Sequence, residues 1–470
     1  MNKSYDVAII GAGSAGLTAL REVRRQTDSF VLINEGPYGS TCARAGCMPS
    51  KALIEAANAF YRRKALEAFG VSGAEGLAVD IPAVLRRVRR LRDGFVAGML
   101  KLTDDLKDCS IAGRARFLEP QVLAVGERRL HAKKIIIATG SRPVVPGEWA
   151  ALGTRMLTSD DLFEQETLPS NMAVIGLGGL GSEIAQALAR LGIEVTGFDA
   201  DDHIAGLSDS HVNRQAVALL RAEFTLHLGQ AAEPVIEGER IRVRAGGESV
   251  LVDKVLVALG RRPNVDQMGI ENLGVRLDEH GVPPFDARTM QIADLTVYIA
   301  GDANRYLPLL HEALDEGYIA GYNALRDQPV CFERRAPLAI VFTDPGIAVV
   351  GQALADLDRN ETVIGEVDFS SQARARMAED NHGLLRVYVD RSSGRLLGAE
   401  MCAPQGEHLA HLLALAIQRK LTVRELLRMP FYHPVLEEGL RTALREAAGK
   451  LGGADVPDLA FCDRPDADAL

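Results

Sequence analysis

Short apolar runs separated by glycine-rich turns and amphipathic stretches predict an α/β fold for most of the chain. The first run, residues 6–10, is bounded by Gly11, which is typical of a buried strand. A helical stretch follows at 17–25, and a second apolar run at 30–33 leads to Glu35. The predicted order is therefore strand, glycine turn, helix, strand and acid.

This first unit has the spacing of a dinucleotide-binding fingerprint. Gly11, Gly13 and Gly16 open the helix, and Glu35 lies 24 residues after Gly11. Glycines let the backbone approach a pyrophosphate, whose charge is favoured by free amide groups and the dipole of the helix. An acid at the end of the next strand accepts hydrogen bonds from ribose hydroxyls. The first unit is therefore predicted to bind a dinucleotide.

A second copy of the same unit begins 165 residues later. A strand precedes Gly176, Gly178 and Gly181, and the strand after the helix ends in Asp199. One such glycine turn is weak evidence, but two copies with their own strands, helices and acids predict two dinucleotide sites. No Lys or Arg follows Asp199 until Arg214, and the acid would repel a 2′-phosphate, so NAD is favoured over NADP.

Composition excludes several classes of protein. The net charge of −10 disfavours a broad nucleic-acid surface, and no run of 18 apolar residues predicts a membrane span. Six cysteines in 470 residues are too few for a disulfide scaffold. Glycines interrupt the apolar N-terminal stretch, and no small-residue cleavage site follows it, which argues against a signal peptide. A cytoplasmic location is expected.

Cys42 and Cys47 form the one close cysteine pair. In a cytosolic protein such a pair is more often redox-active or metal-binding than structural. Zinc would require two more ligands, and no second close cysteine pair exists. His408 and His411 share a helix face but have no clear supporting ligand, so no metal site is expected. Pro49 fits the first turn of a helix.

Residues from about 336 onward have a different pattern. Alternating runs at 338–342, 347–350 and 384–389 predict an antiparallel sheet accompanied by helices. The last twenty residues are rich in Asp and are expected to form a loosely docked acidic tail.

The chain resembles the class I flavoprotein pyridine nucleotide–disulfide oxidoreductases, and among them the dihydrolipoamide dehydrogenases. The resemblance covers residues 4–450, in which the motifs occur in the order and at the separations of that family. They are the two glycine fingerprints with Glu35 and Glu183, Cys42 to Lys51, 138–143, 260–264, 301–302, 342–345 and 433–438.

The resemblance implies two Rossmann-like domains that bind FAD and NAD, and a C-terminal α+β dimerisation domain. The expected boundaries are 1–147 with 265–335 for FAD, 148–264 for NAD, 336–450 for dimerisation, and 451–470 for the tail. It also implies a homodimer that acts on a lipoyl-carrying protein or a small disulfide substrate.

The roles of individual residues follow from the same resemblance. Cys42 would exchange with the substrate, Cys47 would contact the flavin ring, and His433, oriented by Glu438, would be the acid–base catalyst from the other subunit. Lys51 and Glu183 would pair beside the flavin N5, and Glu35 and Asp302 would hold the adenosine ribose and the ribityl chain. The remaining expected cofactor contacts are Gly113, Thr139, Gly140, Ser141, Gly260, Leu309 and His311.

Three residues depart from the family pattern. Ser40 replaces a glycine before the redox motif, and Arg44 places a positive charge between the cysteines, where it either stabilises a thiolate or points outward. Gly179 replaces an apolar or aromatic residue over the nicotinamide pocket, which puts tight NADH binding in doubt.

Other functions remain open. Another disulfide reductase or a metal-ion reductase, of the glutathione or mercuric type, is the nearest, although the acidic Asp199 region and the lone Cys462 disfavour it. A flavin NADH oxidase would not need both Cys42 and Cys47. A non-catalytic component that binds lipoyl proteins is the alternative from a different class.

Overall fold

The computed structural model describes residues 3–452 and 457–459, which form two compact units. The first unit is Met1–Leu53, Asp80–Leu168 and Leu256–Arg334. The second is Ile54–Val79, Pro169–Val255 and Arg335–Leu470. The predicted Cys462 and most of the predicted acidic tail lie outside the described residues.

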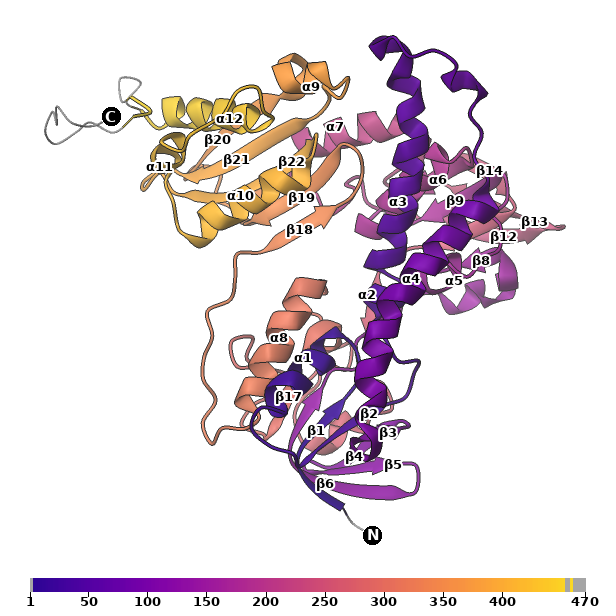
Figure 1. Cartoon of the computed structure of the whole chain (residues 1–470), viewed down its shortest axis with the longest axis vertical. Helices are drawn as coiled ribbons and strands as arrows, with labels where there is room; N and C mark the ends of the chain where they lie inside the picture. Colours follow the sequence, from indigo (N-terminus) through magenta and orange to yellow (C-terminus); the bar gives the residue numbers. More distant parts are fainter. Residues whose placement is uncertain (1–2, 453–456, 460–470) are drawn as a thin grey trace, which may run out of the picture. The chain divides into compact units, whose positions relative to one another are not determined.

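The first unit is built on a seven-stranded sheet in the order β3-β2-β1-β6-β5-β4, with β17 also paired to β6 (Figure 1). Strands β1, β2, β3, β6 and β17 run parallel, and β4 and β5 add an antiparallel extension. The strands are β1 Lys3–Ile10, β2 Phe30–Asn34, β3 Ser110–Ala112, β4 Ala115–Glu119, β5 Val122–Val125, β6 Arg128–Ile137, β7 Ser141–Pro143, β8 Met156–Leu157, β16 Arg261–Pro263 and β17 Val297–Ile299. The helices are α1 Ser14–Val23, α2 Thr41–Arg44, α3 Cys47–Tyr61, which continues into the second unit, α4 Ile81–Asp104, α5 Ser159–Leu162 and α8 Leu310–Asn323.

Both faces of this sheet are buried, which explains the uninterrupted apolar run of β1. Ala8 and Ile10 belong to one core cluster, whereas Val7 and Ile9 belong to another. The second cluster includes α1 and α8, which lie side by side in Figure 1. A Cβ on Gly317 of α8 would lie 2.2 Å from the carbonyl oxygen of Ala15, so glycine allows the two helix backbones this close approach.

The second unit contains a sheet of strands in the order β11-β10-β9-β15, in which β9, β10 and β11 run parallel, and a three-stranded antiparallel sheet, β12-β13-β14. These strands are β9 Asn171–Ile175, β10 Glu194–Phe198, β11 Thr225–His227, β12 Glu233–Glu237, β13 Arg240–Ala245, β14 Glu248–Val252 and β15 Lys254–Val257. Helix α6, Gly179–Arg190, follows β9, and α7, Ser210–Arg221, follows β10. The element order repeats that of β1, α1 and β2.

The C-terminal part of the second unit is a five-stranded antiparallel sheet in the order β18-β19-β22-β21-β20. Its elements are β18 Leu338–Val341, β19 Gly346–Gly351, β20 Thr362–Asp368, α9 Ala373–Met377, β21 Leu384–Asp390, β22 Leu396–Ala403, α10 Gly406–Gln418, α11 Val423–Leu427 and α12 Glu437–Lys450. Apolar residues of α10, α11 and α12 form one core cluster with alternate residues of the strands. The other strand residues point to the opposite face.

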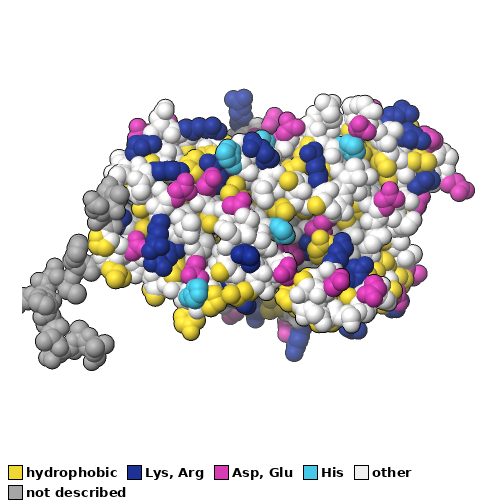
Figure 2. Space-filling view, turned by 90° about the horizontal axis from the view of Figure 1, so that it is seen from above, with side chains coloured by type: hydrophobic (Ala, Val, Ile, Leu, Met, Phe, Trp, Pro, Cys, Tyr) yellow, Lys and Arg dark blue, Asp and Glu magenta, His cyan; other side chains and the backbone are white. Residues whose placement is uncertain are grey.

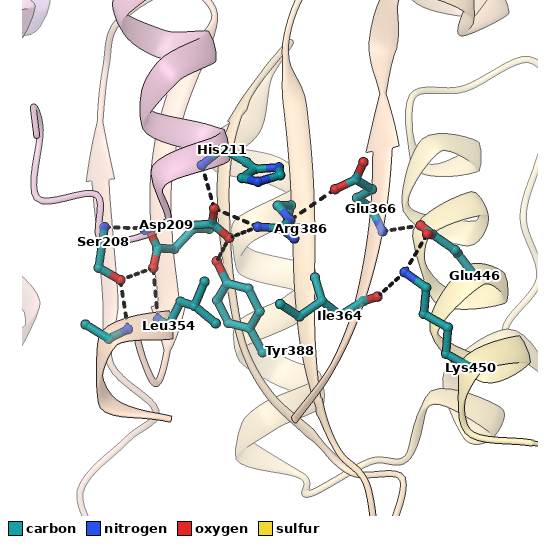
Figure 3. Close-up of polar contacts among 12 residues, drawn as sticks. Ser208, Asp209, His211, Leu354, Ile364, Glu366, Arg386, Tyr388, Glu446 and Lys450 are labelled. Atoms are coloured by element: carbon teal, nitrogen blue, oxygen red, sulfur yellow. Dashed lines mark hydrogen bonds and ion pairs between the residues drawn. The ribbon is translucent and has the colours of Figure 1, made fainter. Parts of the chain in front are cut away.

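A polar network occupies that opposite face and holds the start of α7 (Figure 3). Glu400, fully buried, accepts hydrogen bonds from the backbone amides of Ser208, Asp209 and Leu354. Asp209 accepts from Arg386 and from the Tyr388 hydroxyl. Both buried carboxylates are thus well supplied with donors, which fixes α7 on the antiparallel sheet.

The α/β fold predicted from the sequence is confirmed, including the repeated Rossmann-like order and the C-terminal antiparallel sheet with helices. The predicted domain boundaries stay a prediction. Acidic and basic side chains are interspersed on the face that Figure 2 shows. None of the helices within the described residues is long and apolar enough to span a membrane.

Candidate active site

The first unit contains a cavity of about 680 Å³, which we call the dinucleotide cavity. It lies at the carboxyl ends of β1 and β2, where α/β proteins bind nucleotides. Its lining includes Gly11, Ala12, Gly13, Asn34, Glu35, Arg44, Gly113, Arg114, Thr139, Gly140 and Arg142. The volume is typical of a ligand site.

Glycine is required at the first and third positions of the turn that borders this cavity. A Cβ on Gly11, whose φ is +111°, would lie 2.2 Å from the carbonyl oxygen of Ala138. A Cβ on Gly16 would lie 1.9 Å from the carbonyl oxygen of Gly11. Nothing lies within 4 Å of a Cβ on Gly13, so at this position the absent side chain leaves open space for a ligand.

The hydroxyl of Thr139 supplies a test of whether FAD fits. Its Oγ1 is buried and has no hydrogen-bond partner among the residues that the structure describes, although it belongs to a residue that lines the cavity. Buried hydroxyls nearly always have a partner, so this atom calls for a ligand donor or acceptor. The open glycine turn and the unpaired hydroxyl together fit the expected dinucleotide.

The turn that contains Asp302 is held by Ser141 and Arg261, which belong to the predicted motifs, and by Glu316 and Arg334, which do not. Ser141 Oγ donates to Asp302 Oδ2 at 2.6 Å, and Arg261 donates to both the hydroxyl and the carbonyl of Ser141. Glu316 Oε2 accepts from the amide of Gly301 at 2.7 Å and pairs with Arg334 through its other oxygen. Burial raises the pKa of Glu316 above its ordinary value, against the opposing effect of Arg334.

The other predicted flavin contacts are distributed around this unit. Gly113 and Gly140 line the cavity, and both have the positive φ that favours glycine. Leu309 and His311 lie at the start of α8, where His311 is half-exposed. The structure brings the glycine turns together at one cavity, while the predicted roles of Leu309, His311 and Gly260 stay predictions.

Cys42 and Cys47 are brought together by two successive helices. Cys42 lies in α2, and Cys47 is the first residue of α3. The hydrogen bond between the two thiols, with burial, raises the pKa of Cys42, while the charge of Lys51 opposes this shift. Interacting thiols on two short segments are suited to forming a reversible disulfide.

Local sequence explains this arrangement. Ser40 begins α2 and its hydroxyl accepts from the amide of Ala43 at 3.2 Å, so the departure from glycine supplies a helix cap. Gly46 separates the helices, and a Cβ there would lie 3.2 Å from Cys42 Cα. Arg44 lines the dinucleotide cavity, and its predicted effect on a thiolate stays a prediction.

The second glycine turn repeats the geometry of the first. Gly176 follows β9, and the amide of Leu177 donates to Asp199 Oδ2 at 2.5 Å. A Cβ on Gly179 would lie 3.3 Å from Val341 Cγ2, so this glycine gives β18 room against the start of α6. Val341, which lies within the same unit, therefore occupies part of the space that a side chain at position 179 would fill.

One face of α6 binds the loop after β18 through polar side chains. Glu183 accepts from the amide of Phe342 at 2.8 Å. Gln186 exchanges two hydrogen bonds with the backbone of Asp344, at 2.8 and 2.9 Å. Arg190 donates to the carbonyl and the carboxylate of Asp344. These three side chains therefore fix the loop that contains Asp344 on α6.

Arg190 also contacts α3 and the segment that follows α7. It is 3% exposed, pairs with Glu223, donates to Asn58 of α3, and stacks on the Tyr61 ring at 4.0 Å. We expect Arg190→Leu to lower the free energy of unfolding by about 2–3 kcal/mol, because Glu223 and Asp344, whose side chains are 9% and 34% exposed, lose their charge-assisted hydrogen bonds to a buried guanidinium. Urea unfolding of the purified variant measures this, with the exposed Arg214→Leu in α7 as control. A loss below about 1 kcal/mol would show that the arginine is dispensable.

Asp380 gives this region a pH dependence. Burial, with a smaller contribution from Asp344, raises its pKa from 3.8 to about 7, against the charges of Arg62 and Arg190. Between these values the folded state binds more protons than the unfolded state, so its contribution to stability falls as pH rises from about 4 to 7. We expect Asp380→Asn to reduce the loss of stability between pH 5 and 8 by at least about 1 kcal/mol. Urea unfolding at both pH values measures it, and an unchanged difference would contradict it.

His433 and Glu438 form a pair at the start of α12. His433 Nδ1 lies 3.0 and 3.1 Å from the two carboxylate oxygens of Glu438, and the His433 side chain is 74% exposed. The hydrogen bond from His433, and a second from the amide of Val435, lower the pKa of Glu438. The carboxylate thus fixes the Nδ1 side of the ring and leaves Nε2 for an acid–base role.

Two family models match successive parts of the chain. Residues 5–317 match the family model described as pyridine nucleotide-disulphide oxidoreductase. The chain belongs to this family. Residues 338–444 match its dimerisation domain, which supports the expected homodimer. The predicted cofactors, FAD and NAD, are confirmed as those of the family.

Relatives within the family carry different names. A dihydrolipoyl dehydrogenase of Haloarcula marismortui is 31% identical, over 95% of this chain and 97% of its own. A mercuric reductase of Shigella flexneri is also 31% identical, over 97% of this chain and 82% of its own. The flavoprotein disulfide reductase RclA of Escherichia coli has a TM-score of 0.81 at 23% identity, covering 94% and 99% of the two chains. The chain is therefore an enzyme of this oxidoreductase family, whose substrate must be argued from its site.

The predicted site residues fall into two groups. The redox cysteines, Lys51 and the FAD contacts belong to the first unit, whereas the second glycine turn, Glu183 and the His433 pair belong to the second. The pairing of Lys51 with Glu183 therefore stays a prediction. Sequence motifs missed Arg114, Gln186 and Arg190, because ion pairs and helix contacts with distant loops leave no local fingerprint.

Proposed function

We propose that the protein is an NAD-dependent dihydrolipoyl dehydrogenase, which moves electrons between dihydrolipoyl groups and NAD+ through Cys42 and Cys47. The hydrogen-bonded thiol pair at the start of α3 is the observation that carries this proposal. A non-catalytic binding protein would have no need for two interacting thiols with a lysine about one helical turn after Cys47. Similarity to a dihydrolipoyl dehydrogenase over almost the whole chain supports the same substrate class.

Thiol–disulfide exchange defines the roles of the cysteines. In the oxidised enzyme a dihydrolipoyl thiolate attacks Cys42 Sγ, and the Cys42–Cys47 bond breaks to leave a mixed disulfide and a Cys47 thiolate. The second dihydrolipoyl sulfur then attacks the first lipoyl sulfur, and the bond between that sulfur and Cys42 Sγ breaks. This step releases lipoyl disulfide and leaves both cysteines reduced. The two electrons are now held by the dithiol. FAD, when bound, supplies the electron transfer between this dithiol and NAD+.

His433 is suited to move the protons that this exchange requires. The attacking dithiol must lose protons to become nucleophilic, and an imidazole titrates near neutral pH. The exposed His433 of one subunit would serve the cysteines of the other subunit in the homodimer. Glu438 remains ionised because its pKa is lowered, so it holds the ring and stabilises the imidazolium.

The second glycine turn supports NAD over NADP. The carboxylate of Asp199 lies at the turn, held by the amides of Leu177 and Asp201. Both oxygens retain a lone pair for a ribose hydroxyl, and their charge opposes a 2′-phosphate. A cytoplasmic location and a lipoyl-carrying protein as the natural substrate complete the proposal.

Reduction of another disulfide or of a thiol-bound metal ion is the second candidate. The similarity to a mercuric reductase over 97% of this chain is the observation that favours it. The acidic residues after β10 do not distinguish the two candidate functions, so the electron acceptor that the enzyme uses must discriminate between them.

The proposal is tested by NADH consumption with purified, FAD-loaded protein and four conditions: lipoamide, glutathione disulfide, mercuric ion, or no acceptor. We expect fast turnover with lipoamide and at least about 100-fold lower kcat/KM with glutathione disulfide, and slow turnover with NADPH. Turnover that is faster with mercuric ion, or equal without acceptor, would contradict the lipoyl assignment. Asp199→Asn serves as the matched variant and is expected to raise activity with NADPH relative to NADH.

A further inference from the structure

The two glycine turns of this chain can be aligned residue by residue from their hydrogen bonds. Ile10 pairs with Ile33 in the first parallel sheet, and Ile175 pairs with Phe198 in the second. The amide of the next glycine donates to the carbonyl of the second strand in each, Gly11 to Ile33 at 2.7 Å and Gly176 to Phe198 at 2.8 Å. The residues that follow Ile33 in the first fold therefore correspond one by one to those that follow Phe198 in the second.

By this register the counterpart of Asp199 is Asn34, and the counterpart of Glu35 is Ala200. The side chains confirm the equivalence. The amide of Ala12 donates to Asn34 Oδ1 at 3.1 Å, as the amide of Leu177 donates to Asp199 Oδ2. Each donor lies between the first two glycines of its turn.

Asn34 has the free valences that a ribose requires. Its Oδ1 retains one lone pair after accepting from Ala12, and its Nδ2 retains one hydrogen after donating to the carbonyl of Gly36 at 2.9 Å. Asn34 also lines the dinucleotide cavity. The carboxamide can therefore accept from one ribose hydroxyl and donate to the other.

Glu35 is engaged elsewhere. Its Oε2 lies 2.6 Å from Arg114 Nε, and Arg114 also donates to Gln267 Oε1 at 2.5 Å. Both members of the ion pair are about half exposed, which places them at the rim of the cavity rather than at the turn. The position of Glu35 in the second turn is taken by Ala200, a residue that cannot bind a ribose.

We propose that Asn34, and not Glu35, holds the 2′-hydroxyl of the adenosine ribose of FAD. The first fold then uses a neutral amide where the second uses the carboxylate of Asp199, so the two folds recognise the ribose by different chemistry. Glu35 and Arg114 form an ion pair at the rim of the dinucleotide cavity. The proposal depends on FAD as the cofactor of the family and is independent of which disulfide is the substrate.

The test measures binding of two dinucleotides to the apoprotein by quenching of flavin fluorescence. One is FAD, and the other is FAD whose adenosine lacks the 2′-hydroxyl. We expect wild-type protein to prefer FAD by about tenfold, because the analogue cannot form the hydrogen bond to Asn34 and leaves the Asn34 side chain without that partner. In Asn34→Ala the preference is expected to fall below about twofold, whereas Glu35→Gln keeps it.

The ratio of the two affinities separates recognition from folding. A purely structural role for Asn34 would weaken both dinucleotides alike and leave the ratio unchanged. Asn34→Asp retains the acceptor for the Ala12 amide, so we expect it to fold and to keep the preference. Loss of the preference in Glu35→Gln, its persistence in Asn34→Ala, or equal binding of the two dinucleotides by wild-type protein would each overturn the proposal. No turnover is measured, so failure of the lipoyl assignment leaves this test unaffected.

Discussion

The Cys42→Ser variant is expected to lose dihydrolipoamide-dependent reduction of NAD+ by at least about 1,000-fold. Serine cannot form the mixed disulfide that the exchange requires, because its oxygen does not take part in thiol–disulfide chemistry at neutral pH. The Cys42–Cys47 hydrogen bond places the two sulfurs together, so we expect the loss of Cys42 to leave Cys47 without its disulfide partner. Steady-state kinetics with purified, FAD-loaded variant measures the loss.

Two controls make this result specific. Cys331→Ser alters an exposed cysteine that belongs to no predicted site and is expected to leave kcat within about twofold. Reduction of the flavin by NADH is expected to persist in Cys42→Ser, since NADH is predicted to bind at the second glycine turn and not at Cys42. Turnover that survives Cys42→Ser at more than a tenth of the wild-type rate would contradict the disulfide mechanism.

The second large effect is expected at His433. Replacement with Gln is expected to lower kcat by about 100- to 10,000-fold, the usual contribution of a positioned acid–base group. Flavin content is expected to be unchanged, because His433 belongs to the second unit and is exposed. Glu438→Gln, which keeps the shape but removes the charge that stabilises the imidazolium, is expected to cost about tenfold.

His408→Gln is the matched control, since His408 is exposed on α10 and its nearest carboxylate, Glu407, is 3.8 Å away. We expect its kcat to stay within about twofold of wild type. If His433→Gln and His408→Gln have equal activities, the assignment of the acid–base role to His433 fails.

The sequence predicted the parts of this protein that depend on local patterns. Two glycine turns with strands on both sides fixed both Rossmann-like folds, because close backbone approach at Gly11 and Gly16 tolerates no Cβ. The short spacing of Cys42 and Cys47 likewise identified them as a candidate redox pair, although it did not predict two helices separated at Gly46.

Contacts between distant segments were not predictable in this way. Arg190 contacts residues 58, 223 and 344, which share no spacing in the sequence. The network on Glu400 similarly joins α7 to a strand almost 200 residues later (Figure 3). The offset at Glu35 is a different case, because it lies 24 residues after its glycine and Asp199 lies 23 after its own. Only the strand register shows which residue reaches the turn.

The most direct test of the account is the thiol state of Cys42 and Cys47 under two reductants. The oxidised, FAD-loaded protein is treated anaerobically with NADH or with dihydrolipoamide, and free thiols are then alkylated and assigned by mass spectrometry. We expect neither Cys42 nor Cys47 to be alkylated before treatment and both to be alkylated after either reductant. Cys109 is the control and is expected to be alkylated equally in every sample once the protein is unfolded. A reductant of either kind that leaves Cys42 and Cys47 blocked would contradict electron transfer between NAD and a dithiol through this pair.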